Sequence, residues 1–266
     1  MGASLWIGWN TCIETVRQPV FYLLTAVMGL VILTSPAITL FVMRDSTPLI
    51  VEMGIGTVTL SGLILTILIS WRVVTEEIEK KTALTILSKP ISRESFLIGK
   101  FLGVLTTVHV SAGLLLSLLI FTVWFQGGEA NRSTAGFWSM WSSYGHVILS
   151  GGALACLQLM VLVAASVAVA SYFGLVVNAC IMAAFFSAGH LSGYLVSGIG
   201  TGWLRSVVSW AFLLIPDLEV FNIGWAATQS RSASFQYVGF AASYAVVYSL
   251  VFLLTAMCLF RRRELM

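Results

Sequence analysis

The chain contains very few charged residues. Only 9% of its 266 residues are Asp, Glu, Lys or Arg, 58% are hydrophobic, and the mean hydropathy is +0.96. Soluble domains carry about 25% charged residues, so this scarcity excludes a soluble globular protein. The length predicts one integral membrane domain over residues 1–266, with no separate soluble module.

Motifs of catalysis and of nucleotide binding are also missing from the sequence. No GxxxxGK[ST] occurs, because Gly99-Lys100 is followed by Phe101 and preceded at the required position by Glu94, which excludes a P-loop. Without an HExxH or Ser/His/Asp array we predict no enzyme, no catalytic residue, no cofactor and no metal site. No nucleic-acid partner is predicted. Four cysteines lie singly in apolar stretches and are predicted to be small buried hydrophobic residues: Cys12, Cys156, Cys180 and Cys258.

Long apolar runs dominate what is present. A bilayer core of about 30 Å needs about 20 apolar residues in a helix, and six stretches qualify, which predicts an all-α polytopic fold with six transmembrane helices. A further run, Trp203–Ile215, is too short to cross and predicts an interfacial or re-entrant helix within an outer segment 200–236. The six stretches are Phe21–Met43, Ile50–Val74, Leu97–Phe125, Tyr144–Phe173, Val176–Ile199 and Tyr237–Phe260.

The Lys and Arg residues predict the orientation of these spans. With both termini in the cytoplasm, ten cations fall in inside segments and four, Arg44, Arg132, Arg205 and Arg231, fall outside. This asymmetry follows the positive-inside rule. The prediction is a multi-pass protein of a bacterial-type cytoplasmic membrane. The ten inside residues are Arg17, Arg72, Lys80, Lys81, Lys89, Arg93, Lys100, Arg261, Arg262 and Arg263.

The segment before the first span has its own pattern. In residues 5–18, Trp6, Trp9, Ile13 and Val16 recur at helical spacing, and Pro19 follows as a bend. This pattern predicts an amphipathic helix on the cytoplasmic leaflet, with the tryptophans at headgroup level. The alternative is an irregular tail.

A polar segment, residues 75–92, separates the second and third spans. Together with the first turns of the third span (residues 75–100) it holds 9 of the 25 charged residues. Acids precede bases, which suits a helix dipole, and Pro90 ends the helix before Ser92 caps the next one. We therefore predict a short cytoplasmic helix, a sharp corner and a second helix continuous with span three, able to dock a soluble partner. The alternative is a solvated loop that only sets the topology.

These residues also resemble a known family. The sequence resembles the signature of ABC type-2 transporter permeases at Glu77–Thr82, at Leu87–Arg93 and at Ile98–Lys100 with Gly103. Within that family, Lys81 makes the copper-enzyme-maturation and gliding-motility permeases the most similar subset. Three further segments resemble other parts of sequences from that family: Glu14–Phe21, Ile215–Asn222 and Phe260–Leu265.

The resemblance implies a coupling helix, Glu76–Ser88, that docks on a separate ATPase. It implies two ATPase subunits that bind ATP and Mg, and a second permease copy in a homodimer or heterodimer. Within the docking segment, the residues that the resemblance assigns to the partner or to the corner are Glu76, Glu77, Glu79, Lys80, Thr82, Leu87, Pro90, Ser92 and Arg93.

Other polar residues receive weaker assignments. We predict that the histidines have structural roles, as neutral side chains with hydrogen-bond partners; they are His109, His146 and His190. We predict that Asn178 and Gln158 form hydrogen bonds between helices. Gly189 with Gly193, and Gly198 with Gly202, form GxxxG faces for close helix approach, one use of which is a dimer seam. An outer gate or partner surface is predicted at Pro216, Asp217, Glu219 and Asn222, and a capped hairpin without a substrate role is the alternative.

The function expected from all this is a membrane subunit driven by a separate ATPase, exporting a substrate or doing mechanical work. A non-transporting membrane anchor or assembly factor is the first alternative. An ion-gradient-driven transporter is the second, but it needs a carboxylate near the midplane, and no predicted span carries one there.

Overall fold

Every regular element in the described part of the chain is helical. The computed structural model describes residues 2–39, 46–76, 93–126, 134–198, 216–222 and 233–262. These residues contain no strand, so the all-α prediction is confirmed for them. In a bilayer core only internally hydrogen-bonded helices or closed barrels satisfy the backbone, and the apolar runs are long enough for helices. The helices are α1 Gly2–Val16, α2 Pro19–Thr39, α3 Ser46–Ser70, α6 Arg93–Gln126, α7 Thr134–Met140, α8 His146–Ala170, α9 Leu175–Gly198 and α12 Phe235–Arg262.

Three shorter helical segments join them. A π-helical segment η1, Trp71–Glu76, continues α3, and another, η3, Trp141–Gly145, connects α7 to α8. The 3₁₀ helix η4, Leu218–Phe221, precedes α12. Both π segments continue an adjoining α-helix, η1 after α3 and η3 before α8, as π-bulges within helices do.

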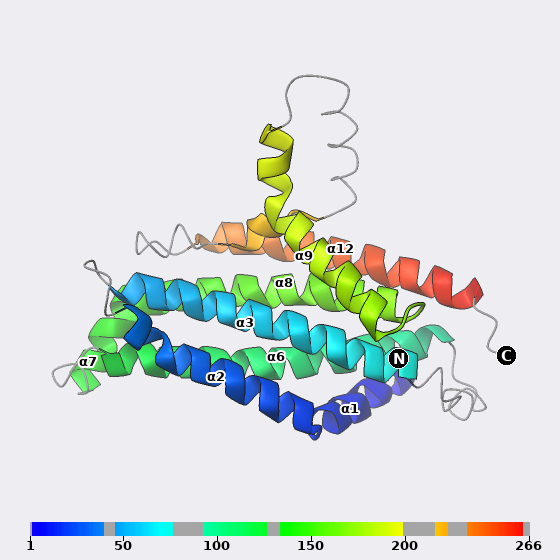
Figure 1. The fold of residues 1–266 in the computed structure, drawn as a ribbon, viewed down its shortest axis with the longest axis horizontal. Helices are drawn as coiled ribbons and strands as arrows, with labels where there is room; N and C mark the ends of the chain where they lie inside the picture. Colours follow the sequence, from blue (N-terminus) through cyan, green and yellow to red (C-terminus); the bar gives the residue numbers. More distant parts are fainter. Residues whose placement is uncertain are drawn as a thin grey trace.

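Five helical stretches are long and apolar enough to cross a membrane. Figure 1 shows α2 and α6 running in one direction and α3, α8 and α12 running in the other. The central helix is α8, with 72% of its most apolar window buried, against 22% for α2 and for α12. The bundle therefore buries α8 and turns α2 and α12 toward the surroundings. The five stretches are Pro19–Ile38, Thr47–Thr75, Glu94–Gln126, Gly136–Ala170 and Phe235–Cys258.

Small residues let α8 pack closely on its neighbours. A Cβ at Gly62 of α3 would clash with Leu159 of α8, and one at Gly152 of α8 would lie 2.9 Å from Leu116 of α6. Each glycine therefore receives a leucine from the facing helix. Lipid tails are as apolar as leucine, so close packing of this kind, together with polar contacts, holds membrane helices together.

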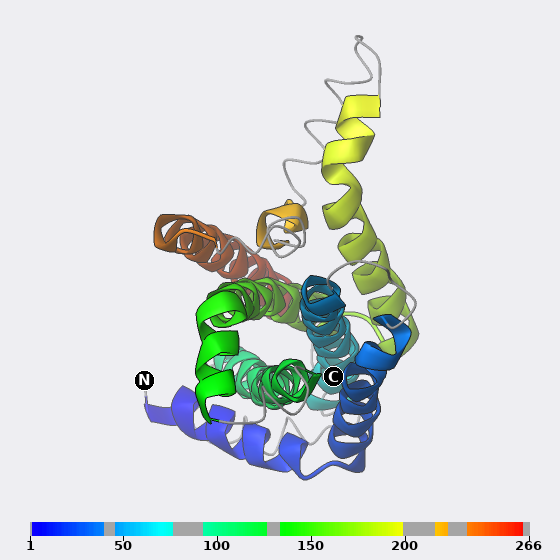
Figure 2. The ribbon, with the colours of Figure 1, turned by 90° about the vertical axis from the view of Figure 1, so that its left-hand side faces the viewer.

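The predicted fifth span behaves differently from the others. Helix α9 begins and ends within one residue of the predicted Val176–Ile199, but Figures 1 and 2 show it leaving the bundle at an angle. Its described apolar stretch, Leu175–Leu191, is shorter than a full crossing. Hydropathy reports the composition of a helix and carries no information about its direction. Of the six predicted spans, the structure supports five.

The cysteine prediction is wrong in part. Cys180 on α9 and Cys258 on α12 are exposed, whereas Cys12 and Cys156 are half-buried. The two exposed thiols lie on α9 and α12, and an apolar side chain costs nothing when it faces lipid tails. In a membrane protein, an apolar residue does not have to be buried inside the protein.

Candidate functional site at the α3–α6 end

One end of the bundle gathers three chain junctions, and we call it the α3–α6 end. Here α3 ends and α6 begins, α1 joins α2, and α8 turns into α9. The N-terminus and the C-terminal end of α12 lie at the same end in Figure 1. The predicted docking segment lies between α3 and α6, so its two described flanks belong to this site.

Most predicted docking residues lie outside the described part of the chain. Glu77, Glu79, Lys80, Thr82, Leu87, Pro90 and Ser92 are among them. Two others mark the flanks: Glu76 is the last residue of η1, and Arg93 is the first residue of α6. The structure thus places the beginning and the end of the segment at one end of the bundle. The predicted coupling helix and corner remain predictions.

The first flank is fixed to the α8–α9 turn by one hydroxyl. Thr75 is 1% exposed, and its Oγ1 donates to the carbonyl oxygen of Ala170 at 2.6 Å and lies 3.2 Å from that of Phe173. Carbonyls at the C-terminus of a helix have no partner within the helix, so a side chain from η1 supplies it here. Thr75 thereby ties η1 to the turn that precedes α9.

The second flank is held by the N-terminal helix. A Cβ at Gly99 of α6 would lie 2.8 Å from Ile7 of α1, and one at Gly103 would lie 2.6 Å from Thr11. On α1, Gly8 is in similarly close contact, since its Cβ would lie 3.1 Å from the carbonyl oxygen of Gly99. The two backbones therefore touch over about one turn of α6. Sequence reasoning missed this contact, although the Gly99–Gly103 spacing is the signal for it.

Helix α1 lies across the bundle. Figure 2 shows it crossing beneath α6, which is seen end-on. Its far side carries Trp6 and Trp9, which are 75% and 64% exposed, whereas Thr11 and Thr15 are buried against the bundle. A helix lying across the spans with exposed tryptophans has the form of an interfacial helix. The structure shows the helix, and its position at a membrane surface stays a prediction.

Lys100 is the one charged residue among the buried side chains of the described chain. It is 4% exposed, and its Nζ lies 5.5 Å from the centroid of the Phe96 ring, which is itself fully buried. A desolvated ammonium group over an aromatic face gains a cation–π attraction. The base of α6 therefore combines the glycine contact with α1 and a buried cation.

A polar cluster links α3, α8 and α9 close to the Thr75 contact. The amide nitrogen of Asn178 lies 3.2 Å from Ser166 Oγ and 3.5 Å from the carbonyl oxygen of Ile67. Farther along, Gln158 Nε2 lies 3.3 Å from His190 Nε2. The predicted interhelical roles of Asn178 and Gln158 are thereby confirmed.

Two of the three histidines contact backbone carbonyl oxygens of their own helices. His109 Nδ1 lies 2.8 Å from the carbonyl oxygen of Leu105, and His190 Nδ1 lies 3.0 Å from that of Phe186, both within their own helices. His146 is exposed at the first turn of α8. The described residues include no group of three or more metal-ligating side chains.

The predicted outer residues form a compact capped turn. Asp217 Oδ1 accepts a hydrogen bond from the backbone N–H of Glu219 at 3.0 Å, and the N–H of Asp217 donates to Tyr244 Oη at 2.8 Å. The Asn222 side chain donates to Glu219 Oε1 at 3.1 Å. Each predicted gate residue except Pro216, which is buried, therefore caps or ties the turn. This geometry agrees with the capped alternative, and the gate prediction is not tested.

The turn is also seated on α9. A Cβ at Gly189 would lie 2.6 Å from Leu218 Cγ, and Leu218 is fully buried. Gly189 therefore receives a side chain from its own chain, so this position is unavailable for the dimer seam. Gly202 lies outside the described residues, and Gly193 and Gly198 lie in a part of α9 for which only the backbone is described.

These features define the class: a helical membrane protein. The chain belongs to the family described as "Protein of unknown function (DUF2705)", whose model matches residues 57–266. No curated protein matches the chain.

The assignment to the ABC type-2 permeases is therefore wrong, since the family that matches is a different one. The motifs behind that assignment, acids before bases, a proline corner and a serine cap, are what any cytoplasmic helix–corner–helix requires. Short motifs of this kind arise from shared local physics without common membership.

Proposed function

We propose that this chain is the non-catalytic membrane subunit of a two-component machine, moved by a separate soluble ATPase that binds the segment 76–93. The proposal rests on the anchoring of that segment and not on the ABC type-2 resemblance. Its single carrying observation is the pair of contacts from Thr75 Oγ1 to the α8–α9 turn. The opposite flank packs closely against α1. By the proposal, a force that the ATPase exerts on the segment therefore acts on α3, α6, α9 and α1 together.

The sequence favours a separate ATPase as the energy source over nucleotide binding by this chain or an ion gradient. The sequence has no P-loop. Within the five candidate spans the acidic residues are Glu52 and Glu94, each close to an end of its span. An ion-gradient-driven transporter is expected to use a carboxylate near the midplane. ATP and Mg are assigned to the partner, and by the proposal two ATPases serve two copies of this chain.

We further propose that the α3–α6 end faces the cytoplasm and that the chain crosses the membrane six times. Arg17, Arg72, Arg93 and Lys100 lie at this end, which favours the inside. Helices α8 and α12 run in the same direction (Figure 1), so the chain must recross between residues 170 and 235. Helix α9, with 24 residues, begins that crossing.

ATPase activity in the purified complex tests the proposal. The wild-type protein, isolated in mild detergent from its native cells, is expected to carry ATP hydrolysis. The double substitution Glu77→Arg/Glu79→Arg should lower that activity at least about tenfold, because charge reversal in the docking segment opposes the partner. Glu14→Arg, at an exposed acid on α1 at the same end, is the control and should keep the activity.

Two results would count against the proposal. Retained ATP hydrolysis in the double variant would remove segment 76–93 as the docking site. A soluble partner that co-purifies through this segment without hydrolysing ATP would favour the membrane-anchor function instead.

A further inference from the structure

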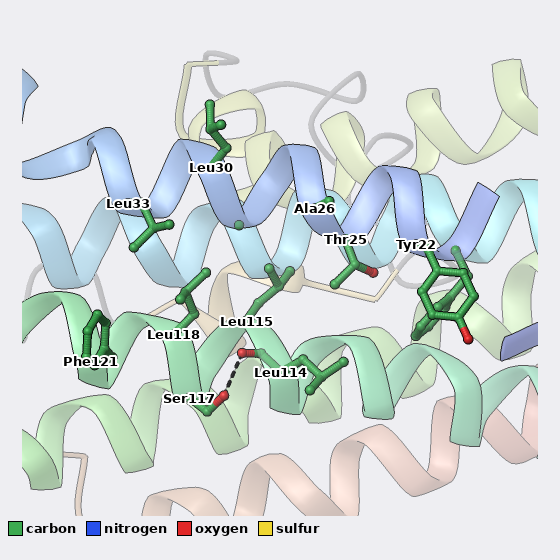
Figure 3. A pocket seen from close by; sticks show the side chains of 12 residues that line it. Tyr22, Thr25, Ala26, Leu30, Leu33, Leu114, Leu115, Ser117, Leu118 and Phe121 are labelled. Carbon is green, nitrogen blue, oxygen red and sulfur yellow. Dashed lines mark hydrogen bonds between the residues drawn. The ribbon is translucent and has the colours of Figure 1, made fainter. Parts of the chain in front are cut away.

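A groove runs along the outside of the bundle between α2 and α6. Its volume is about 610 Å³, within the range of roughly 300–1,000 Å³ typical of small-ligand sites. Figure 3 shows Tyr22 at one end and Phe121 at the other, with leucines along both walls. The groove extends along both helices, parallel to the spans.

The groove has small residues at its floor and large ones at its rims. Gly29 is buried at the floor, where a Cβ would lie 3.0 Å from Leu118 Cδ2. Leu30, Leu114 and Tyr22 stand at the rims and are 62%, 52% and 57% exposed. The exposed side chains at the rims are therefore available to contact an occupant.

The threonine and serine hydroxyls in the groove walls are already paired. Thr25 Oγ1 and Ser111 Oγ are hydrogen-bonded at 3.0 Å across the two helices, and Ser117 Oγ donates to the carbonyl oxygen of Leu114 at 2.7 Å. The first contact also fixes the separation of α2 from α6. Between the ends of the groove a ligand consequently meets mainly apolar contacts, and the Tyr22 hydroxyl lies at one end.

The length of the groove matches one leaflet of a bilayer. Tyr22 and Leu33 lie about three turns apart on α2, roughly 16 Å along its axis. Half of a hydrocarbon core of about 30 Å is about 15 Å. A groove of this length and volume accommodates an extended hydrocarbon chain that spans one leaflet.

Arg17 precedes the first groove residue, Phe21, by four positions in the chain. Arg17 is exposed in the turn between α1 and α2, just over one turn before Tyr22, and the backbone contact from Phe21 N to Gln18 O at 3.1 Å continues the helix between them. Cytoplasmic leaflets carry anionic lipids, which attract Lys and Arg near the surface. The charge and the groove therefore complement the two parts of one phospholipid.

We propose that the α2–α6 groove binds one acyl chain of an anionic phospholipid, whose headgroup lies at Arg17. The bound lipid covers the exposed side of α2 close to the α1–α2 junction. This site is separate from the docking segment, and only the choice of leaflet uses the orientation proposed above.

Native mass spectrometry of the delipidated full-length protein tests this site. The probes are palmitoyl-oleoyl phosphatidylglycerol, which is anionic, and phosphatidylcholine with the same chains. Ala26 is exposed at the groove wall, so Ala26→Leu fills the groove without disturbing the core. Ala37→Leu adds the same side chain to an exposed position of α2 beyond the groove lining and is the control.

The expected result is one tightly bound phosphatidylglycerol in the wild type and in Ala37→Leu, with at least about fivefold weaker binding in Ala26→Leu. Arg17→Gln should remove the preference for phosphatidylglycerol over phosphatidylcholine while leaving chain binding in place. Equal lipid binding by Ala26→Leu and wild type would overturn the proposal. So would a loss of self-association in Ala26→Leu with unchanged lipid binding, which would make the groove a contact between copies.

Discussion

The Thr75 contact allows a sharp test of the mechanical connection at the α3–α6 end. Thr75→Val keeps the volume and the branched shape of the side chain but removes the hydroxyl, so the packing should be preserved. The carbonyl oxygens of Ala170 and Phe173 would then lose the partner that lies 2.6 Å and 3.2 Å away. Because Thr75 is 1% exposed, water does not readily replace it.

The size of the effect can be bounded from both sides. Leaving a buried acceptor unsatisfied costs about 1–3 kcal/mol, whereas polar contacts between membrane helices average about 0.6 kcal/mol when measured by double-mutant cycles. One hydroxyl serving two carbonyls, one at 2.6 Å, places the expected loss near 1–2 kcal/mol. That loss corresponds to roughly a 5- to 30-fold change in the unfolding equilibrium.

Two measurements on the same samples separate a local from a general effect. Unfolding in mixed micelles gives the free energy, and amide hydrogen exchange of residues 171–178 reports on the α8–α9 turn. Thr75→Val should lower the free energy of unfolding and speed exchange in that peptide, and Thr75→Ser should restore both. Thr106→Val is the control, because Thr106 is exposed and bonds within its own helix to the carbonyl oxygen of Leu102.

The reasoning would be refuted if Thr75→Val were within about 0.3 kcal/mol of the wild type with unchanged exchange in the turn. It would also fail if Thr106→Val produced the same loss, because the effect would then follow from any threonine change in a helix. In either case the end of α3 would not be coupled to α9 through this hydroxyl.

Two glycine substitutions test the other close contacts. Gly103→Ala should destabilise the protein by about 1–3 kcal/mol, because the new methyl would lie 2.6 Å from a side chain of α1. Gly113→Ala, on the same helix with nothing within 4 Å, should be neutral or slightly stabilising. Gly189→Ala should likewise lower the melting temperature by displacing η4, whereas Gly239→Ala on α12, which also meets nothing within 4 Å, should not. Equal melting temperatures within either pair would contradict the corresponding contact.

Much of the fold follows directly from the sequence. Apolar runs of 20 or more residues leave helices as the available structure in lipid, and the turn between α8 and α9, residues 171–174, falls close to the boundary between the predicted stretches Tyr144–Phe173 and Val176–Ile199. The helical N-terminal segment and the hydrogen-bonding roles of Asn178 and Gln158 follow from periodicity and from the cost of burying polar groups. These are local or compositional properties.

The candidate site was predicted less completely. The polar segment is conspicuous in the sequence, but the contact of α1 with α6 joins residues that lie about 90 positions apart. The pairing of Gly189 with Leu218 likewise gives a glycine a role inside the chain that its GxxxG spacing alone does not reveal. A glycine motif shows that something approaches closely, and only the fold shows what approaches.

The family assignment shows the same limit. Charged and capping residues near Pro90 reflect requirements common to helix ends, so their order carried less family information than the match over residues 57–266. Sequence pattern alone determined that this protein is helical and suited to a membrane. The reason is that each segment in a bilayer must be apolar and must satisfy its own backbone hydrogen bonds. The tertiary structure decided which helix is central, which glycine meets which side chain and where α9 points, because those outcomes depend on side-chain shape between segments distant in the chain.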